Sequence, residues 1–177
     1  THTEWYRNKF QLTNQDLRNI LAQGLSTGAD YVDIFFEESR LSSLLLEERI
    51  LKRSSAHALR GAGIRVVKDE RTGYAHTTDL SRASLLSTAK TAAAICDGGS
   101  SERAMTFTDK SPSLSVYDTE YPLALTDIGK KIELVRRAET AAWETDSSIV
   151  TVQITLTDSL RHIFIVNSLG LQSGDTR

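Results

Sequence analysis

The amino-acid sequence predicts an α+β fold, in which antiparallel β-hairpins form a sheet with about three helices packed on one side. Three separate stretches repeat apolar residues at helical spacing, and the stretches between them alternate apolar with polar residues at strand spacing. The predicted strands follow one another in groups, which favours antiparallel hairpins over a doubly wound parallel sheet. A length of 177 residues suits one domain, so residues 1–177 are expected to form a single domain.

The first predicted helix begins at Thr13 and ends before Gly28. Thr13 can cap the helix, Asp16 follows three residues on, and Leu12 and Leu17 can form a hydrophobic staple across its first turn. The apolar face then continues at helical spacing with Ile20, Leu21 and Leu25. Gly28 suits the left-handed conformation that often ends a helix.

Strands are expected after this helix. Residues 30–38 alternate apolar with polar side chains, which is typical of a strand. A turn is expected over 39–43, and one or two returning strands over 44–51. Residues 61–67 and 73–77 predict a β-hairpin with a charged tip between them.

A second helix, rich in alanine, is expected from near Ser81 to Ile95, with Asp97-Gly98-Gly99 stopping it. Residues 100–124 contain both prolines and show no steady period. They are expected to form an irregular connection with a short strand at 105–108.

The third predicted helix is capped by Thr126, and the pair Glu133 and Arg137 stabilises its exposed side. Its apolar stripe contains Ile128, Ile132, Val135, Ala138 and Ala142. A strand follows over 150–157, and a turn at Asp158-Ser159 is expected to return the chain over 161–167. Helix-then-hairpin would then occur twice, at 14–51 and 127–167. Residues 170–177 resemble a turn entering another strand, which suggests a truncated chain.

Composition excludes several functional classes. A net charge of −2 argues against a nucleic-acid-binding protein. No apolar run approaches the roughly 20 residues that a membrane span needs. The one cysteine rules out a disulfide framework and a cysteine-based zinc site, and makes a reducing cytoplasm the expected location.

The histidines do not form a recognisable metal motif. His2, His57, His76 and His162 lie on separate predicted elements, whereas a zinc site needs three or four converging ligands. His57 and His76 could approach each other across strands, but ordinary sheet histidines are the favoured interpretation.

The other candidate residues favour structural roles. Cys96, at the end of a helix, is interpreted as a small buried residue. Gly61-x-Gly63 lacks the third glycine and the following helix of a dinucleotide site, so these glycines are expected to permit a bulge or close packing. The acidic residues of the strands more often mark a solvated face than a catalytic pair: Asp33, Glu37, Glu38, Glu47 and Glu48.

The basic residues of the third helix are also interpreted as a solvated face: Lys130, Lys131, Arg136 and Arg137. The sequence therefore predicts no catalytic, cofactor-binding or metal-binding residue in this chain. On its residues alone, it is a non-catalytic module.

Four segments resemble the N-terminal region of the TldD/PmbA metallopeptidases, also called modulators of DNA gyrase. They are Gly28-Ala-Asp-Tyr-Val-Asp-Ile-Phe-Phe-Glu37, Gly61-Ala-Gly-Ile-Arg-Val-Val67, Thr72-Gly-Tyr-Ala-His-Thr-Thr-Asp-Leu-Ser81 and Val166-Asn-Ser-Leu-Gly-Leu171. Their order and spacing extend the resemblance over residues 14–97 and 149–177. The amino-acid sequence of these segments is more similar to the TldD branch of the family than to TldE (PmbA).

The resemblance implies a cytoplasmic zinc peptidase that works as a TldD–TldE heterodimer on unfolded peptides. The family's zinc ligands lie in a C-terminal half that has no counterpart here. Residues 1–177 would then be a non-catalytic N-terminal domain without zinc of its own, which helps to shape the substrate chamber and subunit contacts. An exposed sheet edge within 31–77 could hold an extended substrate by strand addition. The alternative is a free-standing protein-interaction domain without peptidase activity.

Overall fold

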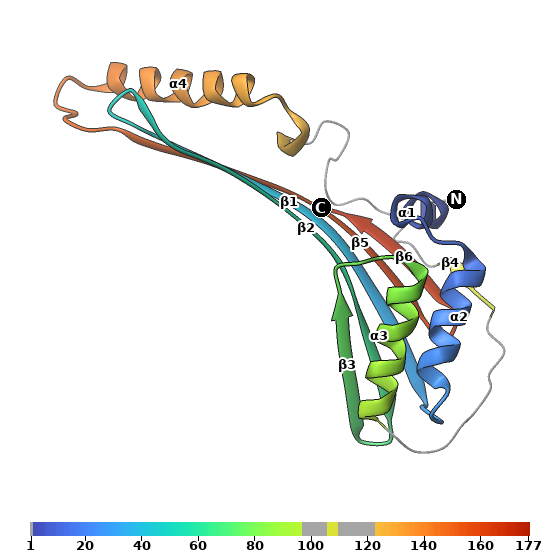
Figure 1. The fold of residues 1–177 in the computed structure, drawn as a ribbon. Helices are drawn as coiled ribbons and strands as arrows, with labels where there is room; N and C mark the ends of the chain where they lie inside the picture. Colours follow the sequence, from blue (N-terminus) through green and yellow to red (C-terminus); the bar gives the residue numbers. More distant parts are fainter. Residues whose placement is uncertain (1, 97–105, 110–122) are drawn as a thin grey trace. The chain divides into compact units, whose positions relative to one another are not determined.

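A computed structural model describes residues 2–96, 106–109 and 123–177 (Figure 1). The chain divides into two compact units. Unit 1 comprises Thr1–Glu38, Arg60–Ser115 and His162–Thr176, and unit 2 comprises Ser39–Leu59, Val116–Arg161 and Arg177. Within the described residues, each unit combines helices with segments of the same long strands, so the predicted α+β class is confirmed.

The strands form one sheet in the order β3-β2-β1-β5-β6-β4. Their bounds are β1 Tyr31–Glu47, β2 Ile50–Lys68, β3 Arg71–Thr77, β4 Thr108–Asp109, β5 Gln153–Asn167 and β6 Leu171–Thr176. The pair β2–β3 is antiparallel, as predicted, and β5 pairs with β6 in antiparallel as well. The short β4 pairs with β6 in parallel, which the sequence did not indicate.

The helices are α1 (His2–Phe10), α2 (Asn14–Leu25), α3 (Arg82–Ile95) and α4 (Ile128–Thr145), with a short 3₁₀ helix η1 (Leu123–Leu125). The described part of the chain therefore has one α-helix more than the three expected. The additional helix is α1, which buries Tyr6 and Phe10 one turn apart. Their i,i+4 spacing is the signal that could have predicted it.

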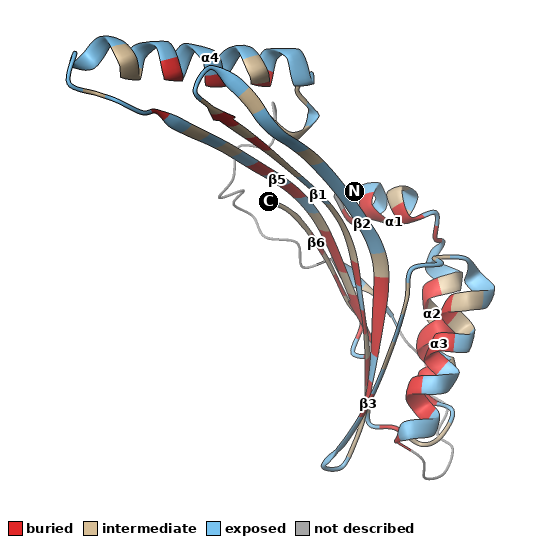
Figure 2. Ribbon diagram, turned by 60° about the vertical axis from the view of Figure 1, so that its left-hand side comes forward, coloured by how far each residue is buried: buried red, intermediate tan, exposed pale blue. Residues whose placement is uncertain are grey.

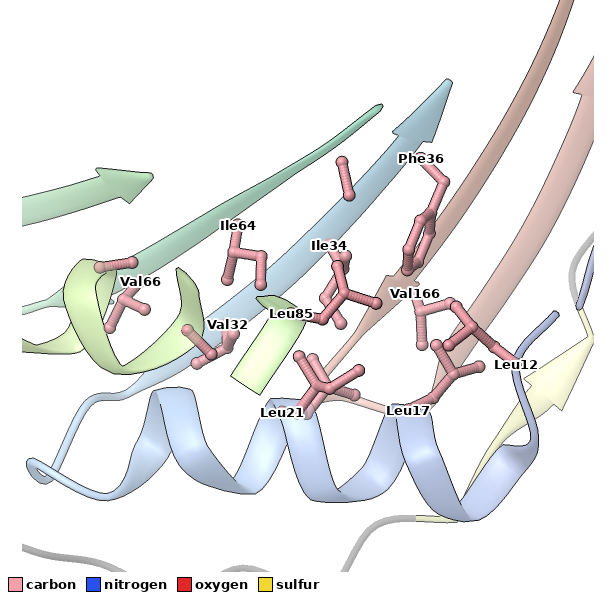
Figure 3. Packing of buried hydrophobic residues seen from close by; sticks show 14 of the residues in the cluster. Leu12, Leu17, Leu21, Val32, Ile34, Phe36, Ile64, Val66, Leu85 and Val166 are labelled. Carbon is pink, nitrogen blue, oxygen red and sulfur yellow. The ribbon is translucent and has the colours of Figure 1, made fainter. Parts of the chain in front are cut away.

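The core of unit 1 lies between the sheet and the helices α2 and α3 (Figure 3). Val32, Ile34 and Phe36 of β1 point toward Leu21 and Leu85, as their alternating pattern predicts. The predicted cap of α2 is confirmed, because Thr13 Oγ1 accepts from the Asp16 N–H at 3.1 Å and Asp16 Oδ2 accepts from the Thr13 N–H at 3.0 Å. The first helix of the sequence analysis is thus correctly placed.

The turn predicted at 39–43 is wrong. Strand β1 runs without interruption to Glu47, so residues 44–47 of the expected return belong to β1 itself. Strand β2 begins at Ile50 and is a single strand that includes residues 61–67. The segment Ser39-Arg-Leu-Ser-Ser43 contains no glycine, proline or asparagine, so nothing in it forces a turn. The chain reverses instead at Glu48 and Arg49, which adopt φ values of 51° and 64°.

The turn predicted at Asp158-Ser159 is also wrong. Strand β5 continues through both residues, and Asp158 is buried within it. The second helix-then-hairpin unit at 127–167 therefore does not exist, and β5 instead pairs with β6 beyond Gly170. The strand expected after residue 170 is confirmed.

The helix α3 confirms the second predicted helix, with Ser81 as its N-cap. The stop at 97–99 and most of the expected connection at 100–124 lie outside the described residues. The short strand expected at 105–108 overlaps β4 (Thr108–Asp109) only at Thr108, because residues 106 and 107 are described but lie outside the strand and residue 105 lies outside the described residues.

In unit 2, α4 covers one face of the strand segments (Figures 1 and 2). Its N-cap is Asp127, one residue beyond the predicted Thr126. The buried face contains Val135 of the predicted stripe, but Ile128 remains 47% exposed. Lys131 and Glu139 are also buried on this face, so the helix contacts the sheet through polar as well as apolar side chains.

Candidate functional site

The histidines occupy unrelated settings. His76 stacks on Tyr74 in β3 with ring centroids 6.2 Å apart, and His57 lies exposed on β2. His162 Nδ1 lies 3.0 Å from Thr176 Oγ1, and its ring lies 5.2 Å from that of Trp5. Among the residues that the structure describes, no group of three or more His, Cys, Asp or Glu could hold a metal ion. The described residues therefore do not fit a zinc site.

The remaining sequence candidates in unit 1 have structural partners. Cys96 is buried, as predicted, and its Sγ donates to the Val66 carbonyl at 3.1 Å. A Cβ on Gly63 would collide with the Tyr74 ring, which confirms close packing at this glycine. Asp33 forms an ion pair with Arg65, and hydrogen bonding to Asp33 raises the pKa of Arg65. Cys96 and Gly63 therefore serve packing, and Asp33 forms a surface ion pair.

The interpretation of Lys131 as part of a solvated face is wrong. Lys130, Arg136 and Arg137 are exposed, but the Lys131 side chain is only 4% exposed and faces the strands. The helical period places Lys131 one turn before Val135, on the buried face. A lysine at that position is a signal for a buried acidic partner, which the sequence analysis missed.

That partner is Asp158, whose Oδ2 accepts from Lys131 Nζ at 2.9 Å and from Ser42 Oγ at 2.6 Å. Lys131 Nζ is also 3.0 Å from Ser42 Oγ. Helix α4 and the strands β1 and β5 each contribute one member, so the cluster joins three elements of unit 2. Asp158 Oδ1 is buried and has no hydrogen-bond partner among the described residues.

The arrangement is not a serine–lysine nucleophile pair. A lysine that activates a serine must be neutral to accept its proton. Lys131 Nζ instead acts as the donor, to Ser42 Oγ at 3.0 Å and to Asp158 Oδ2 at 2.9 Å. Ser42 moreover donates its proton to Asp158 rather than to the lysine. The cluster therefore does not generate a nucleophile.

A cavity of about 330 Å³ adjoins this cluster within unit 2. Asp158 and Ser42 line one part of it. The remaining described lining residues are Arg40, Leu41, Ala56, His57, Ala58 and Ala124. The cavity thus combines apolar walls with one acceptor and several possible donors.

The β2 segment of unit 2 has an unpaired outer edge. Strand β3 pairs with β2 only from Ala62 to Lys68, so residues 50–60 have no neighbour on that side within the described residues. Most side chains of this segment are exposed, including Lys52, Arg53 and Leu59 (Figure 2). An edge of this kind offers backbone N–H and C=O groups to an extended chain.

Two successive segments of the chain match the models of two domains of one protein family. Residues 32–96 match the PmbA/TldA metallopeptidase domain 1, and residues 121–177 match the PmbA/TldA metallopeptidase central domain.

No helix among the described residues is long and apolar enough to cross a membrane.

Curated relatives carry the name metalloprotease TldD homolog. The protein from Buchnera aphidicola (subspecies Acyrthosiphon pisum) is 28% identical over 99% of this chain, and that from Haemophilus influenzae is 30% identical over 94%. The chain spans about 36% and 35% of their lengths. The crystal structure of TldE from Thermococcus kodakarensis shares the fold, with a TM-score of 0.71 over 91% of this chain and 18% identity.

Proposed function

Because the chain belongs to the PmbA/TldD metallopeptidase family, we propose that it is the non-catalytic N-terminal part of a TldD-like zinc metallopeptidase. The longer enzyme would process unfolded peptides in the cytoplasm together with a TldE-like subunit. This chain would help to form the substrate chamber and the contacts between subunits. Its similarity to TldD homologues supports the TldD branch.

The zinc ion would be bound by residues outside the described part of this chain. The described histidines and acids do not converge, and several of them are engaged in ion pairs or ring contacts. No step of peptide hydrolysis is therefore assigned to them. Their contribution would be to hold and orient the peptide.

The unpaired edge of β2 is the observation on which this role rests. An extended peptide could add to residues 50–60 as a further strand, with main-chain hydrogen bonds that do not depend on its sequence. Such binding suits unfolded peptides, since a folded protein keeps its backbone groups paired. Lys52 and Arg53 favour peptides with acidic side chains at this edge.

Purified proteins can test whether zinc binding and peptide cleavage require the longer protein. Metal content and peptide cleavage would be measured for the 177-residue chain and for the uninterrupted protein with its TldE-like partner. We expect zinc and cleavage only in the longer protein. Stoichiometric zinc in the short chain would contradict the non-catalytic role, and a longer protein that neither binds metal nor cleaves peptides would favour the interaction domain.

The edge itself can be tested in the longer protein by proline substitution. Neighbouring N–H groups of β2 point alternately toward β1 and toward the free edge. Proline removes the N–H of the residue that it replaces, and this costs a sheet hydrogen bond only where that N–H points toward β1. Of Ser54→Pro and Ser55→Pro, the more stable variant should therefore be the one at the position whose N–H faces the free edge. We expect this variant to cleave peptides more slowly. Unchanged cleavage by a stably folded edge variant would exclude strand addition at this segment.

A further inference from the structure

We propose that, in the longer protein, the chain that follows Arg177 continues β6 and covers the outer edge of β5 in unit 2. The inference rests on the proposed function because it requires that longer protein. Strand β5 extends from Gln153 to Asn167, whereas β6 pairs with it only over residues 162–166 (Figure 1). Residues 153–160 therefore have no neighbour on that side among the residues that the structure describes.

The hydrogen bonds at the end of β6 set the direction and the register of this continuation. The N–H of Arg161 donates to the Arg177 carbonyl at 2.8 Å, and the N–H of Arg177 donates to the Arg161 carbonyl at 2.9 Å. This reciprocal pair is the next step of the antiparallel β5–β6 ladder. Each further residue of the chain would lie opposite the preceding residue of β5, beginning with Leu160 and reaching Gln153.

The composition of this edge is typical of an interior strand. Natural edge strands are commonly protected by lysine, proline or a bulge, which discourage the addition of another strand. Residues 153–160 contain no lysine, arginine, proline or glycine. Their one charged side chain, Asp158, is buried in an ion pair with Lys131 of α4. The free edge of β2, in contrast, carries the exposed side chains of Lys52 and Arg53.

The relatives contain enough chain for such a strand. The central-domain match extends to residue 177, and the chain spans only about 36% and 35% of the lengths of the two TldD homologues. A strand of the same chain competes with a free peptide at a high effective concentration. Covering β5 leaves residues 50–60 of β2 as the free edge of unit 2 within the described residues. The inference thereby assigns an extended peptide to β2 rather than to β5.

The register also predicts the side-chain pattern of the continuing strand. Residues directly opposite each other in an antiparallel pair lie on the same face of the sheet. Asp158 and Leu160 are buried on the face that contacts α4, whereas Thr157 and Ser159 are exposed. The residue after Arg177, and every second residue beyond it, should therefore be mainly apolar and should alternate with polar residues. The uninterrupted coding sequence shows this directly, and a segment without the alternation would contradict a continuing strand.

Amide hydrogen exchange tests whether the edge is covered. Every second residue from Arg161 presents its N–H to this edge, because the N–H of Arg161 donates across it. We expect the amides of Thr155, Thr157 and Ser159 to exchange at least about tenfold more slowly in the longer protein than in the monomeric 177-residue chain. The N–H of Asp158 points toward β1 and is the matched control, with equal protection in both proteins. Equal exchange of the three edge amides in both proteins would overturn the proposal.

Disulfide formation in the longer protein tests the register. Leu156 lies five residues before Arg161, so the fifth residue after Arg177 would lie opposite it. We expect Leu156→Cys to form a disulfide with a cysteine at this fifth position. A cysteine at the fourth position is the matched control and should form none, because its side chain points to the other face. A disulfide with the fourth position, or with neither position in a folded protein, would overturn the proposal.

The zinc content and peptide cleavage of the same longer protein report on the proposed function separately. A protein that binds zinc and cleaves peptides, but whose β5 edge is neither protected from exchange nor cross-linked, would overturn only the continuation of β6. A protein with a protected and cross-linked edge that neither binds zinc nor cleaves peptides would support the continuation and contradict the proposed function.

Discussion

Lys131 Nζ and Asp158 Oδ2 lie 2.9 Å apart, with side chains that are 4% and 6% exposed. The pair joins the buried face of α4 to β5, and Ser42 of β1 donates to the same carboxylate oxygen. Because neither ion has water to replace its partner, the two depend on each other. The attachment of α4 in unit 2 therefore rests on a polar contact as much as on apolar packing.

Removing one member of this pair should destabilise unit 2 strongly. Lys131→Met leaves a buried carboxylate without its cation, and we expect a loss of about 3–5 kcal/mol in the free energy of unfolding. The measurement is urea unfolding followed by the fluorescence of Trp143, which lies on α4. Lys130→Met, at the exposed neighbouring position, should change stability by less than about 0.5 kcal/mol. Equal effects of the two variants would show that the ion pair does not hold the helix.

The capping box of α2 should make stability depend on pH. Hydrogen bonds from Thr13 lower the pKa of Asp16 in the folded chain. The ionised carboxylate therefore stabilises the fold above its unfolded pKa of about 3.9, and this contribution is lost as the pH falls through the lower folded pKa. We expect Asp16→Asn to be less stable than the parent at pH 7 and the difference to shrink below about pH 4.

The pH dependence is checked by thermal unfolding between pH 3 and pH 7. Glu70→Gln, in the exposed β2–β3 turn, removes a charge without disturbing a cap and is the matched control. A difference between Asp16→Asn and the parent that stays constant down to pH 3 would rule out the capping contribution.

Local signals predicted the elements that local contacts determine. The cap at Thr13, the alternation of Val32, Ile34 and Phe36, and the β2–β3 hairpin all follow from residues close in sequence, and the structure confirms them. Such signals did not reveal that β1 and β5 continue beyond a predicted turn, because strand length depends on the neighbouring strands.

The cluster around Asp158 was beyond sequence reasoning for a similar reason. Its three members are separated by 89 and 27 residues along the chain, and each one alone resembles an ordinary surface residue. Only the burial of Lys131, which the helical period does place beside Val135, could have been anticipated. The acceptor that stabilises it could not, since Asp158 was expected in an exposed turn.

Glycine at position 73 should be required for the packing of α3 against β3. A Cβ at this position would meet the backbone carbonyl oxygen of Ala92, which cannot move without moving the helix. We expect Gly73→Ala to lower the free energy of unfolding by about 1–3 kcal/mol, the usual cost of overpacking. Thr72→Ala, at the exposed neighbouring position, should have a small effect. Similar stabilities of the two variants in urea would contradict the close contact.

The β1–β2 turn should be held in its conformation by α4. Glu48 and Arg49 both adopt positive φ, a conformation that costs an ordinary residue about 1 kcal/mol or more. Glu139 compensates, because its buried Oε1 accepts from the Arg49 N–H at 2.7 Å. We expect Glu139→Ala to destabilise the chain by about 1–3 kcal/mol, since the variant leaves that N–H unpaired. Glu48→Gly, which relieves the unfavourable φ, should restore part of the loss. The amide hydrogen exchange of Arg49 provides the direct measurement, and slow exchange retained in Glu139→Ala would show that another group protects the turn.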